Sequence, residues 1–101
     1  MDTKTLKGDR GWFAESKIDL PNSKVLTILT MKRYSGKLIT TASVSKIENG
    51  VATHAVYQDF TLAVAYSEPK HITAKVVEEQ HNLIDVHDVI QKALVFYGEE
   101  K

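Results

Sequence analysis

The sequence predicts an α+β domain, in which an antiparallel four-stranded meander sheet is followed by one long C-terminal helix packed on one face (ββββα). Three observations predict this fold class. β-Branched residues dominate the middle of the chain, as is typical of strands. Short turn sequences divide that region into segments of strand length. In the last third, apolar residues recur at spacings of three and four, which is the period of a helix.

Length and composition predict one soluble domain. The chain has 101 residues, of which 43% are hydrophobic and 26% are charged, as in an ordinary folded domain. It contains no cysteine, which excludes disulfides, thiolate nucleophiles and cysteine-based metal sites and favours the reducing cytoplasm. No apolar run has the length of a secretory signal or a membrane span, so we expect a cytoplasmic protein that does not contact membranes.

Turn signals place the strands. Residues 1–11 lack periodicity, and we expect them to form a flexible N-terminal tail before a single α+β domain at residues 12–98. Within the domain, the three turn sequences are Pro21-Asn22-Ser23, Ser35-Gly36 and Asn49-Gly50, the last being the strongest short hairpin signal. The four predicted strands cover residues 12–20, 24–34, 37–47 and 51–64.

One long helix is predicted in the last third of the chain. Thr73 can serve as its N-cap, and the helical pattern runs to Gly98. One apolar row should face the sheet, and His87, within the apolar surface, is expected to be a hydrogen-bonded core residue. The sheet-facing row consists of Val76, Leu83, Ile90 and Leu94.

A two-residue turn at Ser35-Gly36 would determine how the flanking strands pair. It places Tyr34 opposite Lys37 and thereby assigns every residue of both strands to a face. The face that carries the helix is then expected to hold Thr27, Leu29 and Met31 with Thr40, Ala42 and Val44, extended by Ala55 and Tyr57. A shift of one residue would exchange the two faces.

The segment MKRYSGK, residues 31–37, surrounds a turn with cations and an aromatic ring. A phosphate-binding loop needs several glycines and a helix N-terminus, whereas this segment has one glycine followed by a strand, so a P-loop is excluded. A charged hairpin tip is the simpler interpretation. The alternative is a face that binds single-stranded nucleic acid. The residues of that alternative site are Lys32, Tyr34, Lys37 and His54.

The histidines do not predict a catalytic or metal site. His81 shares a helical face with Glu78 and Asp85 and could supply metal ligands, but this sector is the polar side of the helix, so a solvated face is preferred. In the expected register His54 lies across from Ser45, as a base lies beside a hydroxyl nucleophile. No carboxylate or oxyanion hole accompanies that pair. We therefore expect no catalysis, no cofactor and no metal.

The predicted helix has more apolar surface than one sheet can cover. A second apolar row, on the side away from the sheet-facing row, is expected to contact a second copy of the chain in a homodimer. The alternative is that Trp12 and Phe13 cover it. The predicted dimer interface consists of Val86, Val89, Ala93 and Phe96.

The charge distribution bears on the choice between two functions. The net charge is zero, but residues 1–46 hold nine Lys or Arg against four acids, so the first half is basic and the second half acidic. A basic half suits nucleic acid, whereas a zero net charge does not. The favoured prediction is a small cytoplasmic interaction or accessory module that binds protein as a homodimer, with single-stranded nucleic-acid binding as the alternative.

Overall fold

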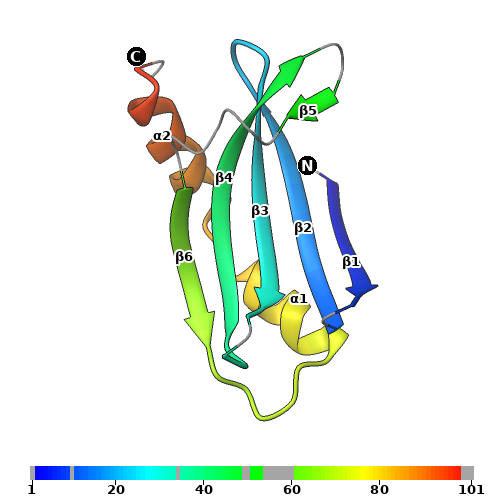
Figure 1. Ribbon diagram of the computed structural model, residues 1–101. Coiled ribbons are helices and arrows are strands. Elements are labelled where there is room, and N and C mark those ends of the chain that lie inside the picture. The colour runs from blue at the N-terminus through cyan, green and yellow to red at the C-terminus, as the bar shows by residue number, and fades with distance from the viewer. Residues whose placement is uncertain (1, 10, 34, 49–50, 54–60, 99–101) are drawn as a thin grey trace.

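The computed structural model describes residues 2–9, 11–33, 35–48, 51–53 and 61–98. Within these residues the chain forms six strands and two helices (Figure 1). The strands are β1 (Asp2–Gly8), β2 (Gly11–Leu20), β3 (Lys24–Lys32), β4 (Leu38–Glu48), β5 (Val51–Thr53) and β6 (Thr61–Ser67). The helices are α1 (Ala74–Asn82) and α2 (Val86–Phe96).

All strands belong to one antiparallel sheet. β1, β2, β3 and β4 follow one another as a meander, and β5 and β6 pair with successive parts of the same free edge of β4. The sheet is therefore five strands wide. Both helices lie behind it in Figure 1, so among the described residues one face is covered by helices and the other is open. The predicted α+β class with an antiparallel meander is confirmed at this level.

The N-terminal segment expected as a flexible tail forms an edge strand. β1 pairs with β2 along its whole length, from Asp2 opposite Lys17 to Gly8 opposite Gly11. Its residues alternate between the two faces of the sheet, as in any strand. Because nearly all of them are polar, the sequence shows no alternation of polar and apolar residues from which a strand could be predicted. The prediction of a tail at residues 1–11 is therefore wrong for residues 2–8.

The fourth predicted strand, residues 51–64, is not continuous. β5 ends at Thr53, and β6 begins at Thr61 and extends to Ser67. Ala42 pairs with Leu62, so the expected extension of its row to Tyr57 is wrong. Ala55, Tyr57 and His54 lie outside the described residues, as do Asn49 and Gly50. The backbone pairing of Glu48 with Val51 is described and spans a two-residue connection.

The pairing of β3 with β4 is shifted by one residue from the prediction. Three residues separate Arg33 from Lys37, whose carbonyl accepts the Arg33 N–H at 2.8 Å, and Gly36 in this loop has φ 84°. A three-residue hairpin loop with a left-handed glycine is a favoured alternative to the two-residue turn. Thr30 consequently lies opposite Thr40, Ile28 opposite Ala42 and Leu26 opposite Val44. Leu29 and Met31 thus lie on the open face, although they were predicted beneath the helix.

The single predicted helix is two helices. Thr73 caps α1 as predicted, and its hydroxyl accepts the Val76 N–H at 3.2 Å. A second cap follows, because the Asp85 carboxylate accepts the Asp88 N–H at 3.1 Å and starts α2. Leu83 lies at the junction and is 83% exposed, so it does not face the sheet as predicted. An aspartate that bonds the backbone ahead of it favours a new helix start over a continuous helix.

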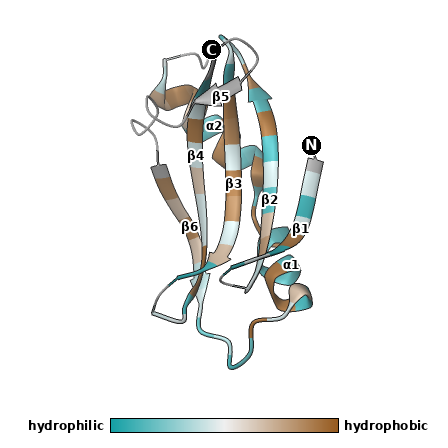
Figure 2. Cartoon of the chain, turned by 45° about the vertical axis from the view of Figure 1, so that its right-hand side comes forward, coloured by the Kyte–Doolittle hydropathy of each residue, from teal (hydrophilic) through white to brown (hydrophobic). Residues whose placement is uncertain are grey.

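Two apolar clusters fill the space between the sheet and the helices. The cluster under α2 combines Val89 and Ala93 with β2, β3 and β4, and Val86 packs against it. The cluster under α1 combines Val77 with Ala14 and Leu38. Figure 2 shows the corresponding strand pattern, in which brown apolar segments alternate with paler ones along β2 and β3.

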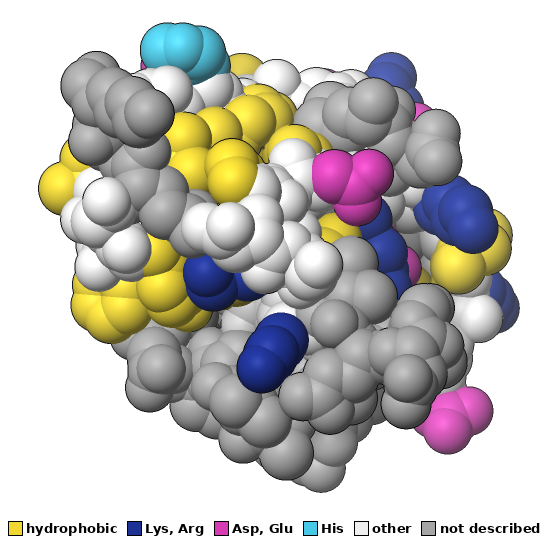
Figure 3. All heavy atoms as spheres, turned by 90° about the horizontal axis from the view of Figure 1, so that it is seen from above, with side chains coloured by type: hydrophobic (Ala, Val, Ile, Leu, Met, Phe, Trp, Pro, Cys, Tyr) yellow, Lys and Arg dark blue, Asp and Glu magenta, His cyan; other side chains and the backbone are white. Residues whose placement is uncertain are grey.

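The predicted dimer row therefore faces the protein's own sheet. Val89 is 2% exposed, Ala93 is fully buried and Val86 is half-buried. Phe96 differs, because it remains 53% exposed beside the exposed Val95. Figure 3 looks down on this end of the molecule and shows yellow hydrophobic side chains gathered at the left, the side of α2 in Figure 1. Phe96 is the one predicted interface residue that stays on the surface.

Candidate functional site

A belt of polar side chains crosses the covered face of the sheet between the two apolar clusters. Five strands each contribute one hydroxyl, and α1 contributes an imidazole and an amide. These side chains form a continuous hydrogen-bonded chain. We call the set the polar belt; its members are Thr3, Ser16, Thr30, Thr40, Ser67, Gln80 and His81.

One backbone carbonyl determines the orientation of the Gln80 amide. The carbonyl of Leu38 can only accept, so Gln80 Nε2, 3.2 Å away, must donate to it. This orients the amide, and its Oε1 accepts from the Ser67 hydroxyl. The second Nε2 proton of Gln80 is then directed to Thr40 Oγ1 at 3.1 Å. Gln80 therefore anchors one end of the chain.

Both ring nitrogens of His81 take part in the belt. Thr40 Oγ1, which accepts from Gln80, lies 2.6 Å from Thr30 Oγ1, and either hydroxyl of this pair can donate to the other. Thr30 Oγ1 lies 2.8 Å from His81 Nδ1, and Ser16 Oγ lies 2.7 Å from Nε2 and 2.8 Å from Thr3 Oγ1. A neutral imidazole donates from one ring nitrogen and accepts at the other, so either tautomer completes both bonds.

Burial opposes protonation of His81. The side chain is 6% exposed, and burial lowers its pKa below the usual 6.5 because the imidazolium would lose its hydration. Ser16, whose hydroxyl lies beside Nε2, is 1% exposed, so a substrate could not reach it as it would reach a serine nucleophile activated by a histidine. The belt joins α1 to the sheet through buried side chains.

The three candidate metal ligands on the helix are separated by this arrangement. Both ring nitrogens of His81 are engaged within the belt, so the prediction of a solvated position was wrong for this residue. Glu78 lines the same open cleft as His81, with a volume of about 410 Å³, whereas Asp85 caps α2. No three His, Asp or Glu side chains in the described part of the chain lie close enough together to hold a metal ion.

The open face of the sheet carries a row of large apolar side chains. Successive pairings place Leu6 opposite Phe13, Phe13 opposite Met31, Met31 opposite Ile39 and Ile39 opposite Tyr66. We call these five residues the outer row. It crosses the full width of the sheet, roughly 19 Å for five strands. Tyr66 is 69% exposed and Leu6 is also exposed, so the row ends in two protruding side chains.

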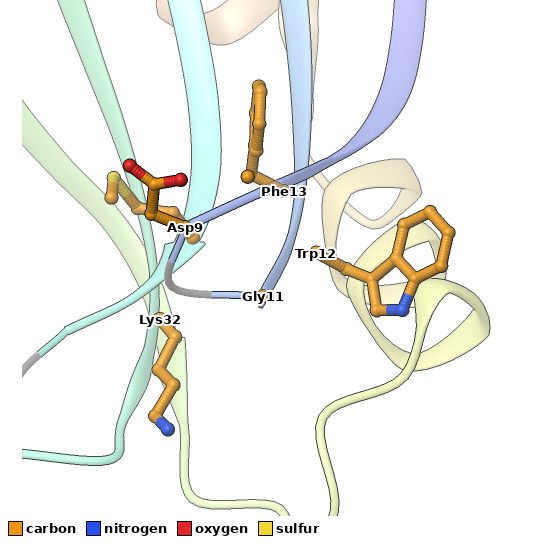
Figure 4. Close-up of a pocket in the computed structure, with 7 residues that line it drawn as sticks. Asp9, Gly11, Trp12, Phe13 and Lys32 are labelled. Atoms are coloured by element: carbon orange, nitrogen blue, oxygen red, sulfur yellow. The ribbon is translucent and has the colours of Figure 1, made fainter.

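Two hollows lie along the outer row. One of about 170 Å³ lies beside Phe13 and Met31, and one of about 320 Å³ lies beside Ile39 and Tyr66. Figure 4 shows the first of them, with Phe13 and Trp12 pointing to different sides of β2. Trp12 packs against the cluster under α1 and Phe13 lies on the open face, so neither of them covers the second apolar row on α2, although the alternative prediction expected them to do so.

The residues predicted for nucleic-acid binding are not brought onto one face. Lys37 lies opposite Arg33, next to the outer row, and its ammonium group is 5.6 Å from the centroid of the Tyr66 ring. Lys32 lies opposite Leu38, in register with the covered face. Tyr34 and His54 lie outside the described residues. The two described members, Lys32 and Lys37, thus lie on different faces, and of these two Lys37 lies beside an aromatic ring of the open face.

Sequence reasoning missed the polar belt. Ser16, Thr30 and Thr40 point to the same face of the sheet as the buried Leu26 and Ile28. The predicted register differed from the observed one by one residue and therefore placed Thr30 on the opposite face. On α1, Gln80 and His81 follow the buried Val77 at spacings of three and four. That spacing was the available signal that both side chains face the sheet. His87, predicted in the core, is exposed instead.

Comparison of the chain with protein-family models, curated proteins and solved structures finds no match. Among the residues that the structure describes, no helix has the length and apolar character needed to cross a membrane.

Proposed function

We propose that the protein is a binding module that forms a homodimer through its outer row. The observation that carries this proposal is an unbroken line of five large apolar side chains across an open sheet face. Extended apolar surface of this kind is characteristic of interaction sites. Val89 and Ala93 are buried within the monomer and are not available to a second copy. We therefore expect the dimer contact on the sheet and not on α2.

The charges beside the outer row support a protein partner. Lys4 lies opposite Glu15 in the sheet register, and the Lys37 ammonium lies 3.6 Å from a carboxylate oxygen of Glu68. Two of the cations beside the row therefore lie next to carboxylates. Charges that are paired in this way repel a second copy of the face less than unpaired cations would. A nucleic-acid strand, in contrast, is held by cations that neutralise its phosphates.

The shape of the surface along the outer row supports a second copy of the chain as the protein partner. Tyr66 protrudes at one end, and the hollow beside Phe13 and Met31 lies nearer the other. A two-fold axis near Ile39 would direct Tyr66 of each copy toward the hollow of its partner, which is the reciprocal contact of an isologous dimer. Sheets that pack face to face in this way lie about 10 Å apart.

The mass of the protein in solution tests the proposal. Wild-type protein should have twice the 11.3 kDa of one chain in sedimentation equilibrium. Met31→Glu places a charge in the middle of the outer row and should give the single-chain mass with unchanged circular dichroism. Thr27→Glu is the matched control, because Thr27 lies on the same strand and face, four residues away. Single-chain wild-type mass, or equal dissociation by both variants, would overturn the homodimer.

Single-stranded nucleic acid is the second candidate, favoured by the position of Lys37 over Tyr66 and by Arg33 next to it. Exposed aromatic rings beside cations can stack bases and bind phosphates. A polarisation titration with a fluorescent oligothymidylate at two salt concentrations tests it. Salt-sensitive binding that is lost in Tyr66→Ala would favour this candidate, and no binding would leave the homodimer as the function of the row.

A further inference from the structure

A cleft with three basic side chains is formed by segments that meet at the end of the sheet where β3 ends and β4 begins. It has a volume of about 390 Å³, which is in the range of small-molecule sites, roughly 300–1,000 Å³. Three segments that are distant in sequence form it: the β1–β2 turn, the β3–β4 hairpin and the connection from β6 to α1. The basic residues are Lys32, Lys70 and His71, and we call the site the basic cleft.

These cations have no carboxylate partner within the described part of the chain. No ion pair there involves Lys32, Lys70 or His71, and no acid lines the basic cleft. Asp9 lies near Lys32, but Figure 4 shows the two side chains extending in opposite directions. Glu68 is engaged by Lys37. The positive charge of the cleft is therefore available to a ligand.

The backbone around the basic cleft also suits an anion. Gly11 and Gly36 line it with φ of 105° and 84°, and a Cβ added to either would meet no atom within 4 Å apart from its chain neighbours, so the space beside both glycines is open. Ile72 precedes Thr73, the N-cap of α1, and the first turn of this helix holds Lys75 and no acid. The helix field there adds to the attraction for negative charge. Pro69 and Ile72 supply an apolar side to the same space.

We propose that the basic cleft binds the terminal phosphate of a small phosphomonoester. Two ammonium groups and an imidazole can donate charge-assisted hydrogen bonds to phosphate oxygens. The cations converge on one cleft and do not form a stripe, which suits a terminal dianion better than a continuous phosphodiester backbone. The volume exceeds that of a phosphate, so the carbon portion of the ligand would lie against Pro69 and Ile72. No outer-row residue lines this site, although the hollow beside Phe13 and Met31 shares Gly11 and Lys32 with it.

Phenyl phosphate is a suitable probe, with NMR amide shifts as the readout. Binding should shift the amides of Gly11, Gly36 and Ile72 in a saturable manner, and inorganic phosphate should shift the same amides at higher concentration. Lys32→Ala combined with Lys70→Ala should weaken the binding of phenyl phosphate about tenfold or more. Lys4→Ala combined with Lys17→Ala removes the same charge elsewhere on β1 and β2 and should change affinity by less than about twofold.

Three results would overturn the proposal. One is the absence of saturable shifts at these amides. Another is an equal loss of affinity in the two double variants, since the effect would then be one of overall charge. The third is tighter binding of an oligothymidylate without terminal phosphate than of phenyl phosphate at the same amides, because the cleft would then recognise a phosphodiester backbone.

Discussion

The Nδ1 atom of His81 lies 2.8 Å from the hydroxyl oxygen of Thr30, and this contact joins α1 to the centre of the sheet. Both side chains are buried, and the other ring nitrogen bonds Ser16 on the neighbouring strand. One imidazole thus bonds two buried hydroxyls, each of which has one further hydroxyl partner in the belt. These bonds stabilise the fold because a buried polar group that loses a partner costs more free energy than a hydrogen bond contributes.

Replacing His81 by Leu should destabilise the fold strongly. The change leaves the hydroxyls of Ser16 and Thr30 without their imidazole partner, and we expect the free energy of unfolding to fall by about 2–5 kcal/mol. Urea denaturation monitored by circular dichroism measures it. His87→Leu is the matched control, because His87 is exposed on α2 and its replacement should change stability by less than about 0.5 kcal/mol. Equal effects of the two substitutions would contradict the role assigned to the polar belt.

The same residue should make stability depend on pH. Burial lowers the pKa of His81 in the folded protein, whereas the unfolded chain titrates near the ordinary 6.5. Below pH 6.5 the unfolded chain therefore binds more protons, and the free energy of unfolding decreases as the pH falls from there toward the lowered pKa. Urea midpoints at about pH 7.5 and about pH 5.5 bracket the start of this window. His81→Gln, which cannot titrate, should show a smaller loss; the same loss in both proteins would assign the effect to other groups.

Gly36 should be required by the hairpin that determines the register of β3 and β4. Its φ of 84° lies in the left-handed region, where a β-branched residue is strained. Gly36→Val is expected to cost about 1 kcal/mol or more, measured by thermal unfolding. Ser35→Ala, at the exposed neighbouring position, serves as the control and should melt like wild type. If Gly36→Val also melts like wild type, the loop does not need this conformation.

The hairpin also shows how far sequence patterns led to the fold. Turn residues, β-branched runs and helical periodicity predicted the α+β class, the Pro21-Asn22-Ser23 turn and the N-cap at Thr73. They could not determine whether the β3–β4 loop holds two residues or three, because Gly36 suits both lengths. One residue more or less in this loop decides which alternate set of β3 side chains is buried. The polar belt was missed for the same reason, since its hydroxyls look like surface residues until the register is known.

Asp85 should be needed for the break between the two helices. Its carboxylate accepts the Asp88 N–H, and loss of an N-cap typically costs about 0.5–2 kcal/mol. We expect Asp85→Ala to lower the free energy of unfolding by that amount in urea denaturation. Asp85→Asn retains a capping oxygen and should retain most of the stability. Equal losses in the two variants would mean that the negative charge matters and the cap does not.

Val89 and Phe96 lie seven residues apart on α2 but should respond very differently to a charge. Val89 is 2% exposed and packs in the cluster under α2, so Val89→Asp buries a carboxylate without a partner and should unfold the protein or cost several kcal/mol. Phe96 is 53% exposed, and Phe96→Asp should remain folded, as measured by circular dichroism. Its mass in solution should also match wild type, because the proposed dimer forms through the outer row of the sheet. Dissociation of Phe96→Asp into folded single chains would return the interface to α2, and unfolding of Phe96→Asp would place that ring in the core.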